Sequence, residues 1–335
     1  MEENLIPSQP EDTVNFESRI DLKPLQENIQ AIKHELNTVI VGQHKMIDQL
    51  LVAILANGHV LLEGVPGVAK TITAKLLAKT LSIGFSRIQF TPDLMPSDIL
   101  GTSVFDLKKS EFEFKKGPVF SNLILIDEIN RAPAKTQAAL FEVMEERQIT
   151  IDGTTYPMTA PFLVIATQNP IEQEGTYRLP EAQLDRFLFK INIDYPKLEE
   201  EISILQKEHA LMSENKLDNI KTLLTAEDIL HFQVLVKQVI VEPNLLEYIA
   251  KLVVNTRENG FLYLGASPRA SIAILNAAKG FAALRGRDFV TPEDIKEAAV
   301  PVLQHRVIVT PEREMEGISS KEIIQQIIES IEIPR

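Results

Sequence analysis

The segment His59-Val-Leu-Leu-Glu-Gly64-Val-Pro-Gly67-Val-Ala69-Lys70-Thr71 decides the fold of this chain. It begins with a short apolar run that ends in glycine, which is typical of a buried strand. A helical pattern starts at the lysine. A glycine-rich turn between a strand and a helix directs backbone amides and a helix N-terminus at one point, where a phosphate anion can bind. The segment therefore predicts a phosphate-binding loop.

Each residue type in this loop has an expected task. Glycine at 64 and 67 lets the backbone curl with its N–H groups inward. The lysine is expected to reach the β and γ phosphates of ATP, and the threonine hydroxyl is expected to bind Mg²⁺. The loop residues predicted to hold nucleotide are Gly64, Pro66, Gly67, Val68, Ala69, Lys70 and Thr71.

Ala69 departs from the usual pattern, which has glycine directly before the lysine. Alanine does not take positive φ as freely as glycine, so it fits this position if the backbone is nearly helical. Taken alone, the loop could also be an ordinary packed turn.

A second motif, Leu123-Ile-Leu-Ile-Asp127-Glu128, makes that alternative much weaker. An apolar strand that ends in two acids buries its length and exposes its carboxylates at the carboxyl end of a sheet. Asp127 is expected to hold Mg²⁺, and Glu128 to polarise the attacking water. Either motif alone is common, whereas the pair in this order indicates a nucleotide hydrolase.

A third apolar strand, Pro161-Phe-Leu-Val-Ile-Ala-Thr167, leads into Gln168-Asn169-Pro170. Asn169 is a candidate to hydrogen-bond the γ phosphate or the attacking water. The alternative is an asparagine that only begins a turn before proline.

The pattern of elements divides the chain near residue 195. Strands alternate with helices before it, which predicts a parallel sheet covered on both faces. Only helical periodicity follows it. We expect a polar lead-in over residues 1–20, an αβα nucleotide domain over 21–195 and an all-α lid over 196–335. Within the first domain, Asp152-Gly153 between two short β-prone runs predicts a hairpin over 147–157.

The last helical pattern, over residues 320–331, places five isoleucines on one stripe: Ile323, Ile324, Ile327, Ile328 and Ile331. The stripe is expected to pack on the helical domain, and a subunit contact is the alternative.

Composition excludes several classes of protein. The 335 residues carry a formal net charge of -13, which argues against a broadly basic nucleic-acid surface. The absence of cysteine rules out disulfides, thiolate metal sites and cysteine nucleophiles. No apolar run reaches the roughly 20 residues of a membrane helix, and the acidic, polar start is unlike a secretory signal. A cytoplasmic protein is therefore expected.

The segments GVPGVAKT, LIDEINRAP, ATQNP, LPEAQLDRF and GASPRAS follow one another in this order. Together they resemble the MoxR family of AAA+ ATPases over roughly residues 20–310, and alanine before the lysine is usual in that family. The resemblance implies a P-loop αβα domain with a helical lid, ATP and Mg²⁺ as ligands, and rings, often hexamers, with ATP between subunits.

The resemblance also assigns individual roles. Arg186 matches an arginine finger that reaches the γ phosphate of a neighbouring subunit, and Arg269 matches the lid arginine called sensor 2. Asn169 matches sensor 1, while Val41 and Gly42 match the segment that contacts adenine. Arg131 and Arg178 lie near motif positions and rank lower. From the residues alone, Arg269 at a helix start after proline could bridge the lid to phosphate, or either arginine could serve only the structure.

Family members carry an inserted segment that residues 91–118 fit, with two short strands around Ser103 to Phe114, and such loops face a pore or a substrate. Members often work with a partner that has a von Willebrand factor A domain, in metal insertion or complex maturation. We expect ATP-driven remodelling of a partner complex, with no stable nucleic acid. A nucleic-acid motor, a small-molecule kinase and a binding switch with negligible turnover are the alternatives.

Overall fold

The computed structural model describes residues 20–170, 177, 179–210 and 220–334. The predicted lead-in therefore lies outside the described residues except for its last position, and so does Arg178.

The centre of the molecule is one five-stranded sheet in which every neighbouring pair is parallel, as predicted. Its order is β2-β5-β8-β1-β9. The bounds are β1 His59–Gly64, β2 Phe85–Gln89, β5 Leu123–Asp127, β8 Leu163–Gln168 and β9 Phe187–Ile193. The strand β9 was not predicted from the sequence, although its alternating aromatic and β-branched residues are a strand signal.

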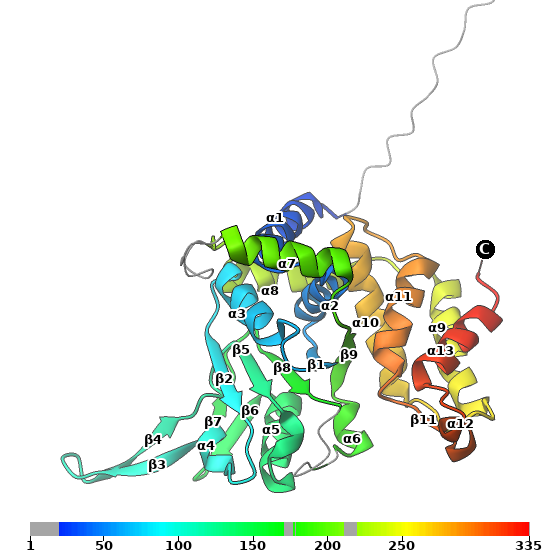
Figure 1. Ribbon diagram of the computed structural model, residues 1–335. Coiled ribbons are helices and arrows are strands. Elements are labelled where there is room, and N and C mark those ends of the chain that lie inside the picture. Colours follow the sequence, from blue (N-terminus) through cyan, green and yellow to red (C-terminus); the bar gives the residue numbers. More distant parts are fainter. Residues whose placement is uncertain (1–19, 171–176, 178, 211–219, 335) are drawn as a thin grey trace, which may run out of the picture.

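Both faces of the sheet are buried, because successive side chains point to opposite sides. Val60 and Leu62 pack into one core, whereas Leu61 between them packs into another. Helices cover both faces (Figure 1). Those between residues 20 and 195 are α1 Lys23–Val39, α2 His44–Leu55, α3 Lys70–Thr80, α4 Pro96–Leu100, α5 Ala134–Glu146 and α6 Glu181–Leu184, with a 3₁₀ turn at Ile129–Arg131.

After β9 the described chain is almost entirely helical. Its helices are α7 Leu198–Ala210, α8 Ala226–Lys237, α9 Pro243–Glu258, α10 Pro268–Leu284, α11 Pro292–Leu303, α12 Pro311–Met315 and α13 Ser320–Ser330. A small antiparallel pair, β10 Leu262–Leu264 and β11 Ile308–Val309, was not predicted. No helix in the described part of the chain is long and apolar enough to cross a membrane.

The first two of these helices rest on the first helices of the chain. Lys207 in α7 donates to the Asn37 carbonyl at 2.8 Å, and Gln233 in α8 donates to the Ile54 carbonyl at 2.7 Å. Figure 1 shows α7 lying across the molecule beside α1. The later helices α9 to α13 group together beside the sheet edge formed by β9.

Two antiparallel hairpins extend from the sheet on the side of β2 (Figure 1). One is β3 Gly101–Asp106 with β4 Glu111–Lys116, and the other is β6 Gln148–Ile151 with β7 Thr154–Pro157. Both hairpins were predicted. In the second, φ is positive at Asp152 and Gly153, which is the geometry of a type I′ turn.

The isoleucine stripe of α13 is buried. Ile323, Ile324, Ile327 and Ile328 are each at most 3% exposed, and α13 packs on α9 and α11. The stripe thus stabilises the helical part of the chain, which confirms the first of the two expectations for it.

Candidate nucleotide site

The phosphate-binding loop joins the end of β1 to the start of α3, at the carboxyl edge of the sheet. A Cβ on Gly64 would lie 2.8 Å from the Ile193 carbonyl oxygen, so glycine lets β9 run close beside the loop. Gly67 has φ +87° and open space around it. Pro66 and Gly67 are exposed, and Val68 is buried beneath them. The loop is thus anchored on one side and open on the other.

The expectation for Ala69 was wrong. Its φ is 61° and its ψ is 15°, which is left-handed rather than near-helical backbone. The chain must reverse sharply between the exposed loop and the first turn of α3, and that reversal falls on this residue. A left-handed conformation costs an alanine about 1 kcal/mol. Strain of this kind is found where a ligand site sets the backbone.

The first turn of α3 is suited to an anion. It has no acidic residue and no side-chain cap, so no group of its own side chains neutralises the positive end of the helix dipole. Lys70 lies at this end, and its Nζ donates to the Gly64 carbonyl at 2.7 Å across the loop. Thr71 is half-buried next to it. These residues fit the phosphates of a nucleotide, with Thr71 as the hydroxyl that would face a bound Mg²⁺.

The paired acids lie at the same edge of the sheet. Asp127 ends β5 and is only 7% exposed, and its Oδ2 accepts a 2.6 Å bond from Arg87 Nε on β2. Glu128 has φ 58°, and its backbone N–H donates to Thr167 Oγ1 at 3.0 Å. Thr167 Oγ1 also lies 3.3 Å from Asp127 Oδ1, so it links the two acids to β8.

The Glu128 carboxylate is held from two sides. Its Oε2 accepts from Gln89 Nε2 at 2.8 Å and lies 3.2 Å from Arg131 Nε. Arg87, Gln89 and Thr167 were not among the predicted site residues. The signal that would have found them is their position at or near the carboxyl ends of β2 and β8, where side chains meet those of β5.

Asn169 follows β8 directly and is 7% exposed. Because β8 lies between β1 and β5, the topology places Asn169 between the phosphate loop and the two acids. That is the position from which an amide could report on the γ phosphate.

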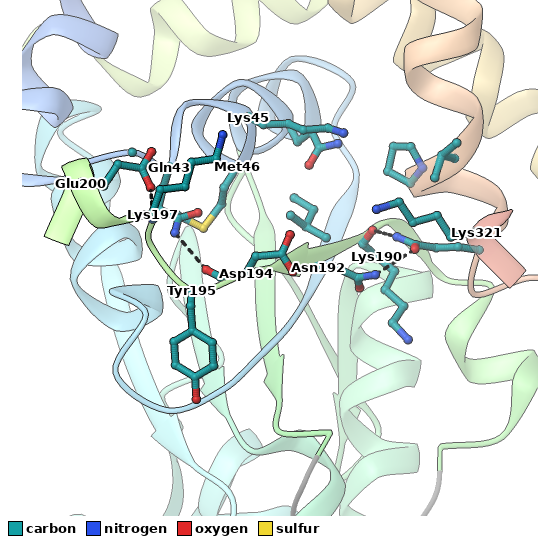
Figure 2. A pocket seen from close by; sticks show the side chains of 16 residues that line it. Gln43, Lys45, Met46, Lys190, Asn192, Asp194, Tyr195, Lys197, Glu200 and Lys321 are labelled. Carbon is teal, nitrogen blue, oxygen red and sulfur yellow. Dashed lines mark hydrogen bonds between the residues drawn. The ribbon is translucent and has the colours of Figure 1, made fainter. Parts of the chain in front are cut away.

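A cavity of about 400 Å³ lies between the end of β9, the start of α2 and the helical part of the chain. Gly42, Gln43 and Met46 form one side, and Asp194 and Tyr195 form another (Figure 2). Ile193, the residue before them, pairs with Gly64 in the sheet, so the cavity borders the phosphate loop. Of the two residues predicted to contact adenine, Gly42 lines the cavity and Val41 is its chain neighbour.

Glu200 of α7 narrows this cavity. A Cβ on Gly42, which has φ +79°, would collide with the Glu200 carboxylate. The Glu200 carboxylate also accepts from the Lys197 backbone N–H at 2.8 Å, and Gln43 reaches the Asp194 carbonyl at 3.5 Å (Figure 2). The glycine thus allows α7 to close over the segment that carries the expected base site.

Arg186 and Arg269 lie elsewhere, and together. Arg186 Nε is 3.5 Å from Glu145 Oε2, and Arg269 Nη2 is 3.1 Å from Glu145 Oε1. Glu145, near the end of α5, was not predicted. The Arg186 guanidinium also lies over the Phe141 ring, 5.9 Å from its centroid. One carboxylate therefore gathers the two arginines that the sequence singled out.

The sheet register places this pair where the parallel strands begin, at the amino edge of the sheet, opposite the carboxyl edge with the phosphate loop. The strands β1 and β9 are parallel, with His59 beside Phe187 and Gly64 beside Ile193. Arg186 immediately precedes β9, so the length of the strand separates it from the loop, about 20 Å at 3.3 Å per residue. Arg269 likewise contacts Glu145 and not the phosphate loop of its own chain, so a bridge from the lid to phosphate stays a prediction.

The chain is similar to known proteins over nearly its whole length. Residues 59–189 match the family described as "ATPase family associated with various cellular activities (AAA)", and residues 254–327 match the AAA lid domain. Chaperone MoxR1 of Mycobacterium tuberculosis is 45% identical, over 90% of this chain and 81% of MoxR1. Protein MoxR of Methylorubrum extorquens is 30% identical, over 90% and 94%.

Similarity extends to an uncharacterised protein, YeaC of Bacillus subtilis, which is 45% identical over 94% of this chain and 96% of YeaC. A crystal structure of a candidate ATPase from Cytophaga hutchinsonii superposes with a TM-score of 0.86 at 46% identity, covering 94% of this chain and 97% of that one. With the phosphate loop, the paired acids and the helical lid in place, these matches show that the chain belongs to the MoxR family of AAA+ ATPases.

Proposed function

We propose that this ATPase works as a homo-oligomeric ring, in which Arg186 and Arg269 of one subunit complete the nucleotide site of the next. The observation that carries the proposal is the placement of these residues. The phosphate loop and the paired acids lie at one edge of the sheet, and both arginines lie at the other. A single chain cannot bring Arg186 to its own phosphate loop without breaking β1 from β9, whereas a head-to-tail neighbour can.

In this proposal each residue has one task. Lys70 and the start of α3 hold the phosphates of ATP, and Glu128 orients the attacking water and accepts its proton. Thr71 and Asp127 would hold Mg²⁺, which supplies positive charge against the phosphates when bound. To do so, Asp127 must exchange its contact with Arg87 for the metal. Asn169 senses the γ phosphate between these groups.

The neighbour's arginines supply the remaining charge. An arginine finger stabilises the charge that develops as the γ phosphoryl group leaves. Since Arg186 comes from another subunit, hydrolysis at each site depends on contact between subunits. By resemblance to the family, we expect a hexamer that operates in the cytoplasm.

The hairpin β3–β4 is our candidate for the part that contacts a client. It extends away from the sheet (Figure 1), and its tip exposes Phe105 (45%), Leu107 (84%) and Phe112 (75%). Exposed apolar side chains on an extended hairpin favour contact with another protein. We propose that hydrolysis moves this hairpin against a partner complex and remodels or matures it. The name of MoxR1 as a chaperone supports this role, and a von Willebrand factor A domain partner and metal insertion follow from the family resemblance.

Phosphate release with Mg²⁺ and ATP over a range of protein concentrations tests the ring. Wild type is compared with Glu128→Gln and Arg186→Ala, alone and mixed. We expect activity to rise steeply with concentration and to be lost in each variant alone. The mixture should recover activity, because Arg186→Ala keeps an intact nucleotide site and Glu128→Gln keeps an intact arginine. In a randomly mixed ring about a quarter of the interfaces would combine the two.

Activity that is independent of concentration and survives Arg186→Ala would contradict the ring and favour a monomeric switch. Stimulation by DNA or RNA that salt abolishes would support a nucleic-acid motor instead. A small acceptor that becomes phosphorylated without release of free phosphate would support a kinase.

A further inference from the structure

A buried arginine, Arg306, bonds to the segment at the start of β9 that carries Arg186. Arg306 lies between α11 and β11, and its side chain is 4% exposed. Its Nε donates to Asp185 Oδ1 at 2.7 Å, and its Nη2 donates to the carbonyls of Asp185 at 2.9 Å and Phe187 at 2.6 Å. Two of these contacts therefore go to the residue before Arg186, and one to the residue after it.

The remaining donors of this guanidinium are also used. Nη1 reaches the Leu188 carbonyl at 3.2 Å and the carbonyl of Val302. An arginine has five N–H donors in a rigid planar fork, so all of them have acceptors here. The neighbouring His305 Nε2 lies 3.0 Å from the Phe187 carbonyl oxygen. The end of α11 thus fixes the backbone on both sides of Arg186.

The same aspartate reaches the segment of Arg269. Asp185 Oδ2 accepts from Ser267 Oγ at 3.1 Å, and Ser267 is the N-cap residue directly before α10. A serine at this position ordinarily caps its own helix, yet this hydroxyl makes no cap bond and serves Asp185. Arg269 follows two residues later. Asp185 therefore links the backbone segments that carry the two arginines, while Glu145 links their guanidinium groups.

A role in stability alone does not account for this arrangement. A buried ion pair contributes little net stability compared with apolar packing, because both charges lose water. Burial accordingly lowers the pKa of Arg306, and the bond to Asp185 opposes that shift. Directional bonds to Asp185, Phe187 and Leu188, the residues on either side of Arg186, however, restrict the backbone to one geometry. That restriction is what a charge delivered to another subunit requires.

We propose that Arg306 is a positioning residue of the ATPase: through Asp185 and Ser267 it aligns Arg186 and Arg269 for the neighbouring subunit's nucleotide. The inference rests on the ring proposed above. It makes the helical lid of one subunit part of the active site of the next, because Arg306, just after α11, and Ser267, just before α10, both bond to Asp185. Movement of the lid would then change hydrolysis in the neighbour.

The test compares Arg306→Met with a matched control, Arg287→Met. Arg287 also contacts a buried aspartate in the helical part, with Nη2 2.7 Å from Asp294 Oδ1, but it has no bond to the segment of Arg186. Both variants are made in the full chain, and their melting temperatures are measured first. If Arg306→Met does not fold, the milder variant Ser267→Ala takes its place. It removes one hydrogen bond to Asp185 and should keep the fold.

We expect Arg306→Met to lower kcat about 10- to 100-fold, the scale of a misplacement near 1 Å. Affinity for a fluorescent ATP analogue should stay within about twofold, because the phosphate loop is at the other edge. Hydrogen exchange over residues 184–188 should become faster in Arg306→Met and not in Arg287→Met. Ser267→Ala should lower kcat up to about fivefold, as expected for one hydrogen bond.

Mixing shows through which subunit Arg306 acts. Arg306→Met mixed with Glu128→Gln should recover activity as Arg186→Ala does, and Arg306→Met mixed with Arg186→Ala should not. If Glu128→Gln recovers activity when mixed with Arg186→Ala but not when mixed with Arg306→Met, the positioning role is overturned and the ring stands. If Glu128→Gln recovers activity with neither Arg186→Ala nor Arg306→Met, the ring is overturned as well. Equal loss of kcat in Arg306→Met and Arg287→Met at equal melting temperature, or an unchanged kcat in Ser267→Ala, would also overturn the inference.

Discussion

The two edges of the central sheet are built in opposite ways. At the carboxyl edge, positive φ falls on Gly67, Ala69 and Glu128, and the phosphate loop is partly exposed. At the amino edge, Arg306 and His305 are buried, and Glu145 pairs with both Arg186 and Arg269. Backbone strain is concentrated at the carboxyl edge, where a ligand binds. The amino edge instead holds two guanidinium groups in fixed positions. The contrast fits the proposed ring, in which the arginines of the amino edge serve another copy of the chain.

The largest expected effect is at the amino edge. Arg186→Ala should lower kcat by about 10³- to 10⁵-fold, the range of arginine fingers. Since the phosphate loop is remote, affinity for ATP should not change. Single-turnover phosphate release at saturating protein measures the effect. A small loss in kcat with a large loss in ATP affinity would show that Arg186 acts in its own chain.

At the carboxyl edge, Glu128→Gln should lower hydrolysis by about 10²- to 10⁴-fold, the range of a general base. The amide keeps the shape and loses the proton acceptor, so ATP should remain bound. Filter binding of labelled ATP together with phosphate release checks both parts. Rapid hydrolysis in this variant would assign the base to another residue.

Acid should weaken the amino edge first. His59, at the start of β1, is buried, and burial, with a smaller contribution from Arg147, lowers its pKa to about 4. Burial also holds the pKa of His305 well below 6.5. The unfolded chain binds protons near pH 6.5 that the folded chain refuses, so stability present above that pH is lost as pH falls toward 4.

For His59 alone that loss is about 3 kcal/mol by pH 4. Urea unfolding from pH 7 to pH 4.5 measures it, and His59→Gln should reduce the number of protons taken up on unfolding by about one. Hydrogen exchange at pH 5 should increase near Phe187 and Val164 before it increases in α3. Uniform exchange at both edges would remove the distinction.

A smaller effect is expected where the two arginines meet. Glu145 is 38% exposed at its side chain, so its ion pairs are worth about 0.2–1 kcal/mol each. In the proposed ring, Glu145→Gln removes a carboxylate that competes with the neighbour's phosphate for the two guanidinium groups. We expect kcat to rise about twofold to fivefold, with little change in melting temperature. Glu142→Gln, an exposed acid on the same helix, is the control.

The smallest effect is expected in the phosphate loop. Ala69→Gly removes left-handed strain of about 1 kcal/mol but adds a similar cost in chain entropy, so stability should change by less than about 1 kcal/mol. A large gain in stability for Ala69→Gly would mean that the left-handed backbone is more strained than alanine normally is.

Much of this arrangement could be predicted because the signals are local. The helices α10 and α11 begin at Pro268 and Pro292, where the sequence signal is local, since proline suits the first helical turn and serine or threonine precedes it. The two hairpins and the strands β1, β5 and β8 carry their turn chemistry and apolar runs in sequence. β9 was not predicted, because it follows a four-residue helix without a turn signal.

The sequence by itself determined the nucleotide chemistry, because each motif is contiguous: a strand, a glycine turn and a lysine form one, and a strand with paired acids forms the other. Only the tertiary structure decided the left-handed backbone at Ala69, the contact of Asp127 with Arg87 and the meeting of Arg186, Arg269 and Glu145. Those features depend on which strands become neighbours and at which register. A contact such as that of Arg269 with Glu145, 124 positions apart, exists only after the sheet and the lid have packed.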